Sequence, residues 1–377
     1  MASTLSARQL NRATLGRQLL LERAPLDVVE AVRRIVALQA QEPASPYLAL
    51  WARLQPFDPA ELDRAFTSLE LVKASLLRIT LHAVTADDYP AFHRAMQPTL
   101  RAARYMDRRF TNEDVSVEEA EALVSDLRTL LRAPRTNRDA EAWLEERFGS
   151  PKPRVWWALR HVGPFVHAPV DGTWSFGSRP AYTASPTEER PDAEAAVRTL
   201  VRRYLEGFGP ASFQDIAQFG TLYRPPIRDA LRSMEGELVE FEGPTGISLY
   251  DVPDGLLPAE DTAAPARLLP MWDSVLLAYA DRSRIVPPEY RTVVMRNNGD
   301  VLPTLLVDGC VAGVWRAIDD GIEATAFRPL PAEAWDALQV EALSLRALLA
   351  PRDPLVYRRY GHWWKDLPAA EVRRLGT

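Results

Sequence analysis

Residues 36–43 read Val-Ala-Leu-Gln-Ala-Gln-Glu-Pro, where an amphipathic run ends in two glutamines separated by one alanine. From Asp27 onward, apolar residues recur at helical spacing between charged ones, which predicts a helix with one buried face. Pro43 disfavours helical backbone at the residue before it, so we expect the chain to become extended around Gln41. Residues two apart point to the same side of an extended segment. The side chains of Gln39 and Gln41 are therefore expected to converge on one site; the alternative is two solvated amides at a helix end.

Length and composition predict a globular chain with more than one core. The 377 residues are 47% hydrophobic and 25% charged, and a chain of this length usually divides into subdomains. Cys310 is the only cysteine, which excludes a disulfide within the chain and a cysteine-cluster metal site. No apolar run is long enough to span a bilayer, and residues 1–20 lack the apolar core of a signal peptide. We therefore expect a cytoplasmic protein that does not contact membranes.

For nucleic-acid binding, the positions of the charged residues are more informative than the net charge. With 45 basic and 51 acidic residues the net charge is −6, which as a bulk property argues against nucleic acid. The basic residues nevertheless cluster, and clusters of arginine are candidate phosphate contacts. A GC-rich genome also raises the arginine content, so compositional drift is the alternative. The clusters are Arg101, Arg104, Arg108 and Arg109, then Arg128, Arg132, Arg135 and Arg138, then Arg198, Arg202 and Arg203.

Helices followed by a pair of strands recur along the chain, which is the pattern of a winged helix-turn-helix unit. From residue 268 the pattern changes to strands, including Val293 and Val294 and a hairpin over 304–316 centred on Asp308-Gly309, and a helix over 332–349 follows. We therefore predict an α+β fold with three tandem winged-helix units, 1–110, 111–190 and 191–265, and a C-terminal β-rich subdomain, 266–377. The expected elements are helices over 6–22 and 58–69 and extended structure over 71–84; helices over 116–131 and 138–148 and a hairpin over 163–176 that turns at Asp171-Gly172; and helices over 193–205, 210–219 and 226–234 with a wing over 237–252.

Several classes of chemistry are excluded by motifs that the chain lacks. Its five histidines are scattered, and no His-Glu-x-x-His or histidine–cysteine spacing occurs, so we expect no metal. No phosphate-binding glycine loop or dinucleotide fingerprint is present, so we expect no nucleotide cofactor. Gly172-Thr-Trp-Ser175 does not form a nucleophile elbow, which disfavours a serine hydrolase.

A second group of polar residues follows the glutamines. In the run 78–84, Arg-Ile-Thr-Leu-His-Ala-Val, the polar residues Arg78, Thr80 and His82 alternate with apolar ones and would share one face of a strand. They are candidates for supporting a site. The alternative is a hydrogen-bonded histidine beside a core.

Five stretches of the sequence match a known family in their residues and not only in their hydrophobic pattern. They are Leu-Gln-Ala-Gln-Glu-Pro (38–43) with Ser-Pro-Tyr-Leu-Ala-Leu-Trp-Ala-Arg (45–53), Arg-Ile-Thr-Leu-His-Ala-Val-Thr-Ala-Asp-Asp-Tyr (78–89), Arg-Tyr-Leu-Glu-Gly-Phe-Gly-Pro (203–210), Leu-Pro-Met-Trp-Asp (269–273) and the hairpin 306–316. With these residues the chain resembles the winged-helix DNA glycosylases of the AlkZ/YcaQ superfamily over nearly its whole length. The most specific signature is the Gln-hydrophobic-Gln motif, matched by Gln39 and Gln41. The YcaQ-type branch is expected to carry aspartate at the second position, so the resemblance is closest to the AlkZ branch.

The resemblance implies a C-shaped body with the two glutamines in its concave channel and a β-hairpin that reaches the DNA. It also implies a cofactor-free, monomeric protein whose partner is double-stranded DNA carrying N7-alkylpurine lesions or interstrand crosslinks from azinomycin-like genotoxins. The hairpin candidates are Asp308, Gly309 and Arg316, although so apolar a hairpin also fits a ribbon buried in the core. The arginine cluster Arg101, Arg104, Arg108 and Arg109 is the candidate contact to the DNA backbone.

Two neutral amides limit the chemistry of such a site. They do not titrate near neutral pH, but they can hold a water and turn their carbonyl dipoles toward a sugar that becomes cationic. An N7-alkylguanine already carries a positive charge and leaves as a neutral base, so it is the expected substrate. No lysine lies near Gln39 and Gln41 in sequence to form a Schiff base, which favours a monofunctional glycosylase. The alternative function is a winged-helix transcription regulator that reads the major groove with residues 224–232, although the chain has no heptad run for dimerisation.

Overall fold

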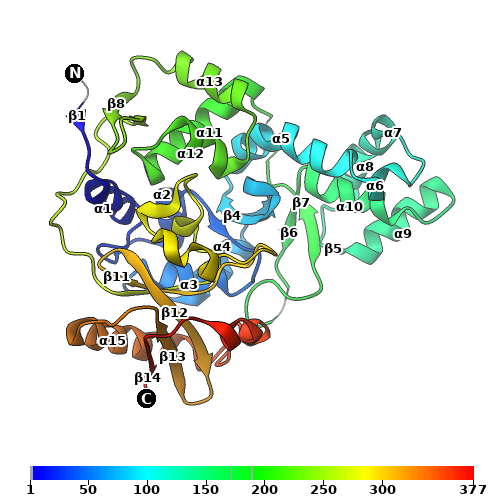
Figure 1. Ribbon diagram of the computed structural model, residues 1–377. Coiled ribbons are helices and arrows are strands. Elements are labelled where there is room, and N and C mark those ends of the chain that lie inside the picture. Colours follow the sequence, from blue (N-terminus) through cyan, green and yellow to red (C-terminus); the bar gives the residue numbers. More distant parts are fainter. Residues whose placement is uncertain (1–2, 171, 188–189) are drawn as a thin grey trace.

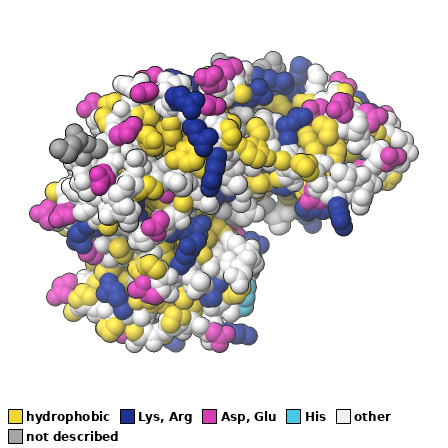
Figure 2. All heavy atoms as spheres, turned by 45° about the horizontal axis from the view of Figure 1, so that its top comes forward, with side chains coloured by type: hydrophobic (Ala, Val, Ile, Leu, Met, Phe, Trp, Pro, Cys, Tyr) yellow, Lys and Arg dark blue, Asp and Glu magenta, His cyan; other side chains and the backbone are white. Residues whose placement is uncertain are grey.

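A computed structural model describes residues 3–170, 172–187 and 190–377, and its mixture of helices and antiparallel sheets confirms the predicted α+β class (Figure 1). In Figure 1 helices α6 to α10 form a lobe that projects to one side of the body. Figure 2 shows a notch between this lobe and the C-terminal part of the molecule, an outline that agrees with the expected C shape. Every helix in the described part of the chain is too short or too polar to traverse a lipid bilayer.

Short helices and strands alternate in the N-terminal part. The side chains of Ser6 and Asp27 cap the first two helices, since each accepts a hydrogen bond from a backbone N–H of the first turn. The helices are α1 (Ala7–Arg17), α2 (Val28–Ile35), α3 (Ser45–Trp51), α4 (Pro59–Thr67), α5 (Tyr89–Tyr105) and α6 (Arg108–Thr111), and the strands are β1 (Ser3–Thr4), β2 (Leu38–Gln39), β3 (Leu71–Ser75) and β4 (Leu81–Thr85).

The middle of the chain repeats this alternation. Its first half contains α7 (Val117–Ala122), α8 (Val124–Leu130), β5 (Arg135–Thr136), α9 (Asn137–Phe148), α10 (Pro153–Val162), β6 (Phe165–Ala168) and β7 (Ala181–Ala184). Its second half contains α11 (Ala193–Phe208), α12 (Phe213–Gly220), α13 (Arg224–Ser233), β8 (Val239–Glu242) and β9 (Ser248–Asp251). Three helices followed by a two-stranded wing is the outline predicted for 191–265.

The C-terminal part is built on a five-stranded antiparallel sheet in the order β10-β11-β12-β13-β14. Asp308 and Gly309 both take left-handed φ angles, 50° and 78°, which confirms the tight turn expected between β11 and β12. Its elements are β10 (Arg267–Leu269), α14 (Arg291–Val294), β11 (Thr304–Val307), β12 (Cys310–Ile318), β13 (Gly321–Ala326), α15 (Ala332–Leu349) and β14 (Glu371–Leu375), with 3₁₀ turns η2 (Ser274–Leu276), η3 (Arg282–Arg284), η4 (Pro288–Tyr290) and η5 (Arg358–Asp366).

A six-stranded sheet in the order β2-β4-β3-β6-β7-β5 positions the two glutamines. It combines strands from either side of the predicted boundary at residue 110, joined where Lys73 on β3 faces His167 on β6. One face packs on α5, α10 and α11 in one hydrophobic core, and the other packs on α3, α4 and the C-terminal sheet in a second. The division at 110, 190 and 265 stays a prediction, and the parts it separates share this sheet and these cores.

Local backbone conformation changes several predicted boundaries. The helix expected to reach residue 22 ends at Arg17, because Leu19 adopts a left-handed φ of 56°. The helix expected over 116–131 is divided into α7 and α8 at Leu123. Val293 and Val294, expected in a strand, lie in the single helical turn α14.

The hairpin expected over 163–176 is wrong in its second strand. β6 pairs with β7, whose residues 181–184 lie beyond the predicted range, while residues 170 and 175 close a smaller loop through a backbone hydrogen bond of 2.8 Å. Asp171 of the predicted turn lies outside the described residues. The strands β13 and β14 and the helix α10 were not predicted.

Candidate active site

Gln39 lies on the edge strand β2, immediately after α2. The helix ends because Val36 takes a left-handed φ of 75°, seven residues before Pro43, so the proline is not what ends it. Beyond this break residues 38 and 39 form β2, where Gln39 pairs with His82 across the β2–β4 ladder, but the chain bends at Gln41, where extended backbone was expected. The backbone N–H of Ala40 donates to Leu81 O at 2.7 Å, which continues the pairing up to Gln41.

The amide of Gln39 is held by a buried arginine. Its Oε1 accepts a hydrogen bond of 2.9 Å from Arg78 Nη2, and the same nitrogen lies 3.0 Å from His82 Nε2. Arg78 Nη1 donates to Phe219 O at 3.0 Å, which anchors the guanidinium to α12. Burial, and secondarily the nearby charge of Arg282, lowers the pKa of Arg78 to about 10, so it remains a cation at neutral pH. A charge-assisted bond therefore fixes the orientation of the Gln39 carboxamide.

His82 is a neutral partner in this arrangement. Its side chain is fully buried, and burial together with the charge of Arg78 keeps its pKa well below the usual value. The ring lies 3.2 Å from Thr80 O through Nδ1, so the tautomer with a proton on Nδ1 satisfies both contacts and leaves Nε2 to accept from Arg78. The hydroxyl of Thr80 donates to Leu77 O and does not contact Gln39. Arg78 and His82 therefore position Gln39, and Thr80 contributes only its carbonyl.

The three residues come together for a reason that differs from the predicted alternation. Arg78 and Ile79 have φ angles of 54° and 60° and form a tight turn between β3 and β4, so Arg78 is not on the strand that carries His82. Left-handed backbone at two residues other than glycine is costly, and such strain is concentrated at functional sites. The turn folds Arg78 back over the strand and onto Gln39.

Gln41 has a different environment. It is exposed, its Oε1 accepts only a long hydrogen bond of 3.4 Å from Leu81 N, and no hydrogen bond among the described residues joins it to Gln39. It lines a hollow of about 370 Å³ at the end of the six-stranded sheet. The neighbouring Glu42 accepts from Tyr360 Oη at 3.0 Å and forms an ion pair with Arg359, which ties the motif to η5.

The hollow beside Gln41 is cationic. Arg104 from α5 and Arg160 from α10 line it, and its described lining residues include no carboxylate. Burial and the charges of Arg104 and Arg160 lower the pKa of His161 to about 3, and burial keeps the pKa of His167 well below its usual value. Both histidines are therefore neutral near pH 7. The arrangement can attract phosphate and hold a neutral water, but it holds no group that titrates near neutral pH.

Residues from the other stretches that resemble the family pack around the segment that carries Gln39 and Gln41. Arg53 and Asp273 form a buried bidentate ion pair with two contacts of 2.8 Å. Ser274 Oγ donates to Ala37 O at 2.9 Å, beside the glutamine motif. A Cβ added at Gly207 would lie 2.4 Å from Val36, so glycine lets α11 approach the end of α2 closely. These residues support the segment that carries Gln39 and Gln41.

The four arginines of the cluster 101–109 lie in different environments. Arg104 reaches the hollow beside Gln41, where it lies over the ring of Trp157. Arg101 forms an ion pair with Glu121 and lines a different cavity. Arg109 pairs with Asp107 at 2.7 Å and Arg108 is exposed. Contact of these arginines with DNA stays a prediction.

The tip of the β11–β12 hairpin packs against α1. Asp308 forms ion pairs with Arg8, at 2.9 Å, and with Arg12, and a Cβ added at Gly309 would lie 2.5 Å from Asn11. Arg316, farther along β12, pairs with Glu323 at 2.7 Å. This packing favours the alternative of a ribbon built into the core, and DNA contact by Asp308, Gly309 and Arg316 stays a prediction.

Sequence reasoning missed the wall of the hollow opposite Gln41. Arg160 donates to Asn137 Oδ1 at 2.8 Å and lies over Tyr182, and these residues come from three separate elements. The available signal was the run Trp156-Trp157-Ala-Leu-Arg160-His161, a basic and aromatic stretch at helical spacing. Groups of acidic, histidine and cysteine residues that could hold a metal ion are absent from the part of the chain that the structure describes.

The protein is expected to be less stable at about pH 5 than at about pH 7. Burial is the first cause that lowers the pKa of His82, His93, His161 and His167, to about 4 for His93. Below the ordinary histidine pKa of about 6.5 the unfolded chain binds protons that the folded chain excludes. The free energy of unfolding therefore decreases as the pH is lowered. Urea titration at the two pH values measures the difference, and His161→Gln should reduce it. Equal or greater stability at about pH 5 would contradict the prediction.

Comparisons with known proteins identify the family of this chain. The family model of AlkZ-like DNA glycosylases matches residues 32–359. A curated protein of Streptomyces sahachiroi, an interstrand DNA cross-link repair glycosylase, is 27% identical over 347 residues, which cover 85% of this chain and 91% of the relative. The solved structure of Streptomyces sahachiroi DNA glycosylase AlkZ shares the fold, with a TM-score of 0.78 at 23% identity over 91% of this chain and 96% of that one. The chain therefore belongs to the AlkZ-like DNA glycosylase family.

Proposed function

We propose that this protein is a monofunctional glycosylase for N7-alkylated purines in double-stranded DNA, with Gln39 and Gln41 at its catalytic centre. The observation that carries the proposal is the exposed amide of Gln41 in a cationic hollow, two residues from the buried amide of Gln39, which Arg78 holds. Family membership supports a glycosylase over the winged-helix regulator considered from the sequence.

The proposed reaction uses the amides as fixed dipoles. Gln41 holds a water by hydrogen bonds, and the oxygen lone pairs of both glutamines face the sugar as it becomes an oxocarbenium ion. Arg104 and Arg160 would repel that cation, but they suit the phosphates on either side of the lesion, which they hold in position. The positively charged N7-alkylpurine departs as a neutral base with the electron pair of the N-glycosidic bond. The water adds to the anomeric carbon of the oxocarbenium ion and loses its proton to the solvent.

A lyase step is not part of the proposal. The structure does place a lysine on a neighbouring strand: Lys73 is buried, and burial lowers its pKa to about 8. In the ladder, however, Lys73 lies opposite Ala83 and shares its face with Leu38, whereas Gln39 lies opposite His82 on the other face. The ammonium packs 4.4 Å from the centre of the Phe176 ring. Lys73 is not among the residues that line the hollow at Gln41, so its amine is not placed to form a Schiff base with a sugar held there.

The proposed substrates include interstrand crosslinks formed by azinomycin-like genotoxins. The similar protein of Streptomyces sahachiroi is an interstrand DNA cross-link repair glycosylase, which supports crosslinks as substrates. The shallow hollow at Gln41, open at the end of a sheet, supports a site that accepts a bulky adduct without enclosing the base. We propose that the protein acts as a monomer in the cytoplasm, without a cofactor.

Base release from a duplex with a single N7-methylguanine tests the proposal. The expected products are free N7-methylguanine and an abasic strand that breaks only after alkali treatment, because no amine takes part. An identical duplex with unmodified guanine should release no base, since its leaving group is not activated. Release from both duplexes, or from neither while DNA binding is retained, would contradict the proposed specificity.

A further inference from the structure

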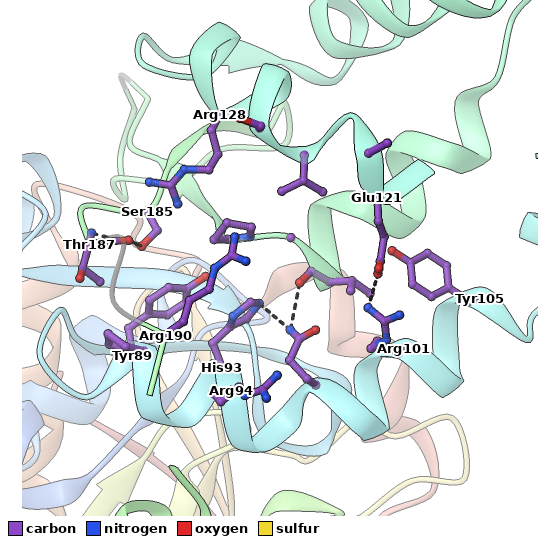
Figure 3. A pocket seen from close by; sticks show the side chains of 18 residues that line it. Tyr89, His93, Arg94, Arg101, Tyr105, Glu121, Arg128, Ser185, Thr187 and Arg190 are labelled. Carbon is purple, nitrogen blue, oxygen red and sulfur yellow. Dashed lines mark hydrogen bonds and ion pairs between the residues drawn. The ribbon is translucent and has the colours of Figure 1, made fainter. Parts of the chain in front are cut away.

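A cavity of about 620 Å³ lies along α5, separate from the hollow beside Gln41. Its walls are one face of α5, the helix α8, and the segments just before β6 and just after β7 (Figure 3). Neither glutamine of the motif is among its lining residues. The glycosylase chemistry proposed above therefore does not account for it.

Positive charge predominates among the described residues that line this cavity. Four of its described lining residues are arginines, Arg94, Arg101, Arg128 and Arg190, and one is a carboxylate, Glu121. Glu121 is already paired with Arg101, as Figure 3 shows at one end of the cavity. In the same view Arg128 reaches in from α8, across from the α5 side chains. Arginines gathered from three segments of the chain around one space favour an anionic ligand.

A buried hydroxyl in the wall lacks a partner. Tyr89 is 2% exposed, and its hydroxyl has no hydrogen-bond partner among the described residues. Its ring stacks on His93 at 5.2 Å, and Gln97 holds His93 through a contact of 3.0 Å while donating to Val162 O at 2.9 Å. Burial lowers the pKa of His93 to about 4, so this support is neutral. An unsatisfied buried hydroxyl costs about 1–3 kcal/mol, which a ligand oxygen would recover.

An apolar hollow adjoins the charged cavity. It has a volume of about 530 Å³, shares Arg94 and Arg101 with the cavity, and lies between α5, α11 and α13. Leu222, Tyr223 and Pro226 form part of its wall. A charged space that shares a wall with an apolar one suits a ligand with an anionic end and a flat, weakly polar end.

We propose that the cavity binds the phosphate group of a nucleotide and that the adjoining hollow holds its base. Arg94 and Arg190, both lining residues of the cavity, contact the phosphate oxygens, and the Tyr89 hydroxyl donates to one of them. A free mononucleotide and a nucleotide unit of a DNA strand present the same chemistry. The DNA source rests on the proposed function, whereas the free nucleotide does not.

Calorimetric titration of the intact protein with deoxyguanosine monophosphate, deoxyguanosine and inorganic phosphate tests the site. The monophosphate should bind at least about tenfold more tightly than the nucleoside, which lacks the charge. The double variant Arg94→Gln, Arg190→Gln should lose at least about tenfold in affinity for the monophosphate. Arg358→Gln removes one exposed arginine outside the cavity and should leave binding of the monophosphate unchanged. Tyr89→Phe should weaken binding while circular dichroism stays unchanged.

Binding of undamaged duplex DNA, followed by fluorescence anisotropy against salt concentration, separates the two sources. If the free monophosphate does not bind but the double variant weakens duplex binding and lowers the salt slope by about 2, the ligand is the DNA backbone. If the double variant binds the monophosphate and the duplex as tightly as the intact protein, the proposal is wrong. Both titrations are independent of base release, so a protein without glycosylase activity still gives a result.

Discussion

Gln41→Ala is expected to lower the rate of base release from an N7-methylguanine duplex by about 100-fold or more. Removal of one preorganised polar group that stabilises a transition-state charge costs about 10²–10³ in rate. Gln41 is exposed, with a single long hydrogen bond to the backbone, so its truncation should leave the fold intact. Single-turnover kinetics with enzyme in excess, together with circular dichroism, measures the effect on chemistry alone.

Gln39→Ala should show a loss of similar size together with a loss of stability. Without Gln39 Oε1, Arg78 Nη2 loses a 2.9 Å acceptor inside the protein, and an unpaired buried donor costs about 1–3 kcal/mol or more when charged. Gln214→Ala, at an exposed glutamine on α12, is the matched control and should retain full activity. If both Gln39→Ala and Gln41→Ala retain activity, catalysis does not depend on the two glutamines.

Asp273→Ala is expected to reduce the free energy of unfolding by about 3–5 kcal/mol, because it leaves the Arg53 guanidinium buried without its counter-ion. The side chains of Arg53 and Asp273 are 1% and 0% exposed, and both guanidinium nitrogens that face the carboxylate lie 2.8 Å from it. The pair joins the end of α3 to the loop before η2. Urea unfolding at neutral pH measures the loss.

An exposed ion pair provides the control for this effect. Arg374 and Asp320 also approach to 3.0 Å, but their side chains are 67% and 58% exposed, so Asp320→Ala should cost less than about 1 kcal/mol. Replacement of both buried partners by apolar residues, Arg53→Met with Asp273→Leu, should recover much of the loss, because neither charge is then left unpaired. If Asp273→Ala proves no more destabilising than Asp320→Ala, the pair does not hold these two parts together.

Local features were predictable because the residues that decide them are neighbours in sequence. Ser6 and Asp27 cap α1 and α2 through residues three positions away. The Asp308-Gly309 turn follows from the left-handed backbone that this dipeptide tolerates. The candidate motif at Gln39 and Gln41 was recognised from residues 38–43 and from the stretches that accompany it along the chain.

Predicted element boundaries and strand partners were wrong where tertiary packing overrides the local sequence pattern. The alternation of Arg78, Thr80 and His82 suggested one strand face, yet a turn at Arg78 and Ile79 divides them. The long segment between β6 and β7 concealed the true partner of β6, because the Asp-Gly dipeptide offered a nearer turn.

The sequence by itself determined the α+β class, the family resemblance and the two amides that limit the chemistry, because composition, periodicity and short motifs are local properties. Only the tertiary structure decided what surrounds the amides. The bond from Arg78 to Gln39 requires a turn to fold back on its own sheet, and the hollow at Gln41 requires α5, α10 and β7 to converge. The partners in the Arg53–Asp273 pair are 220 residues apart. Contacts at such separations depend on how the buried faces of helices and sheets pack, and no short segment contains that information.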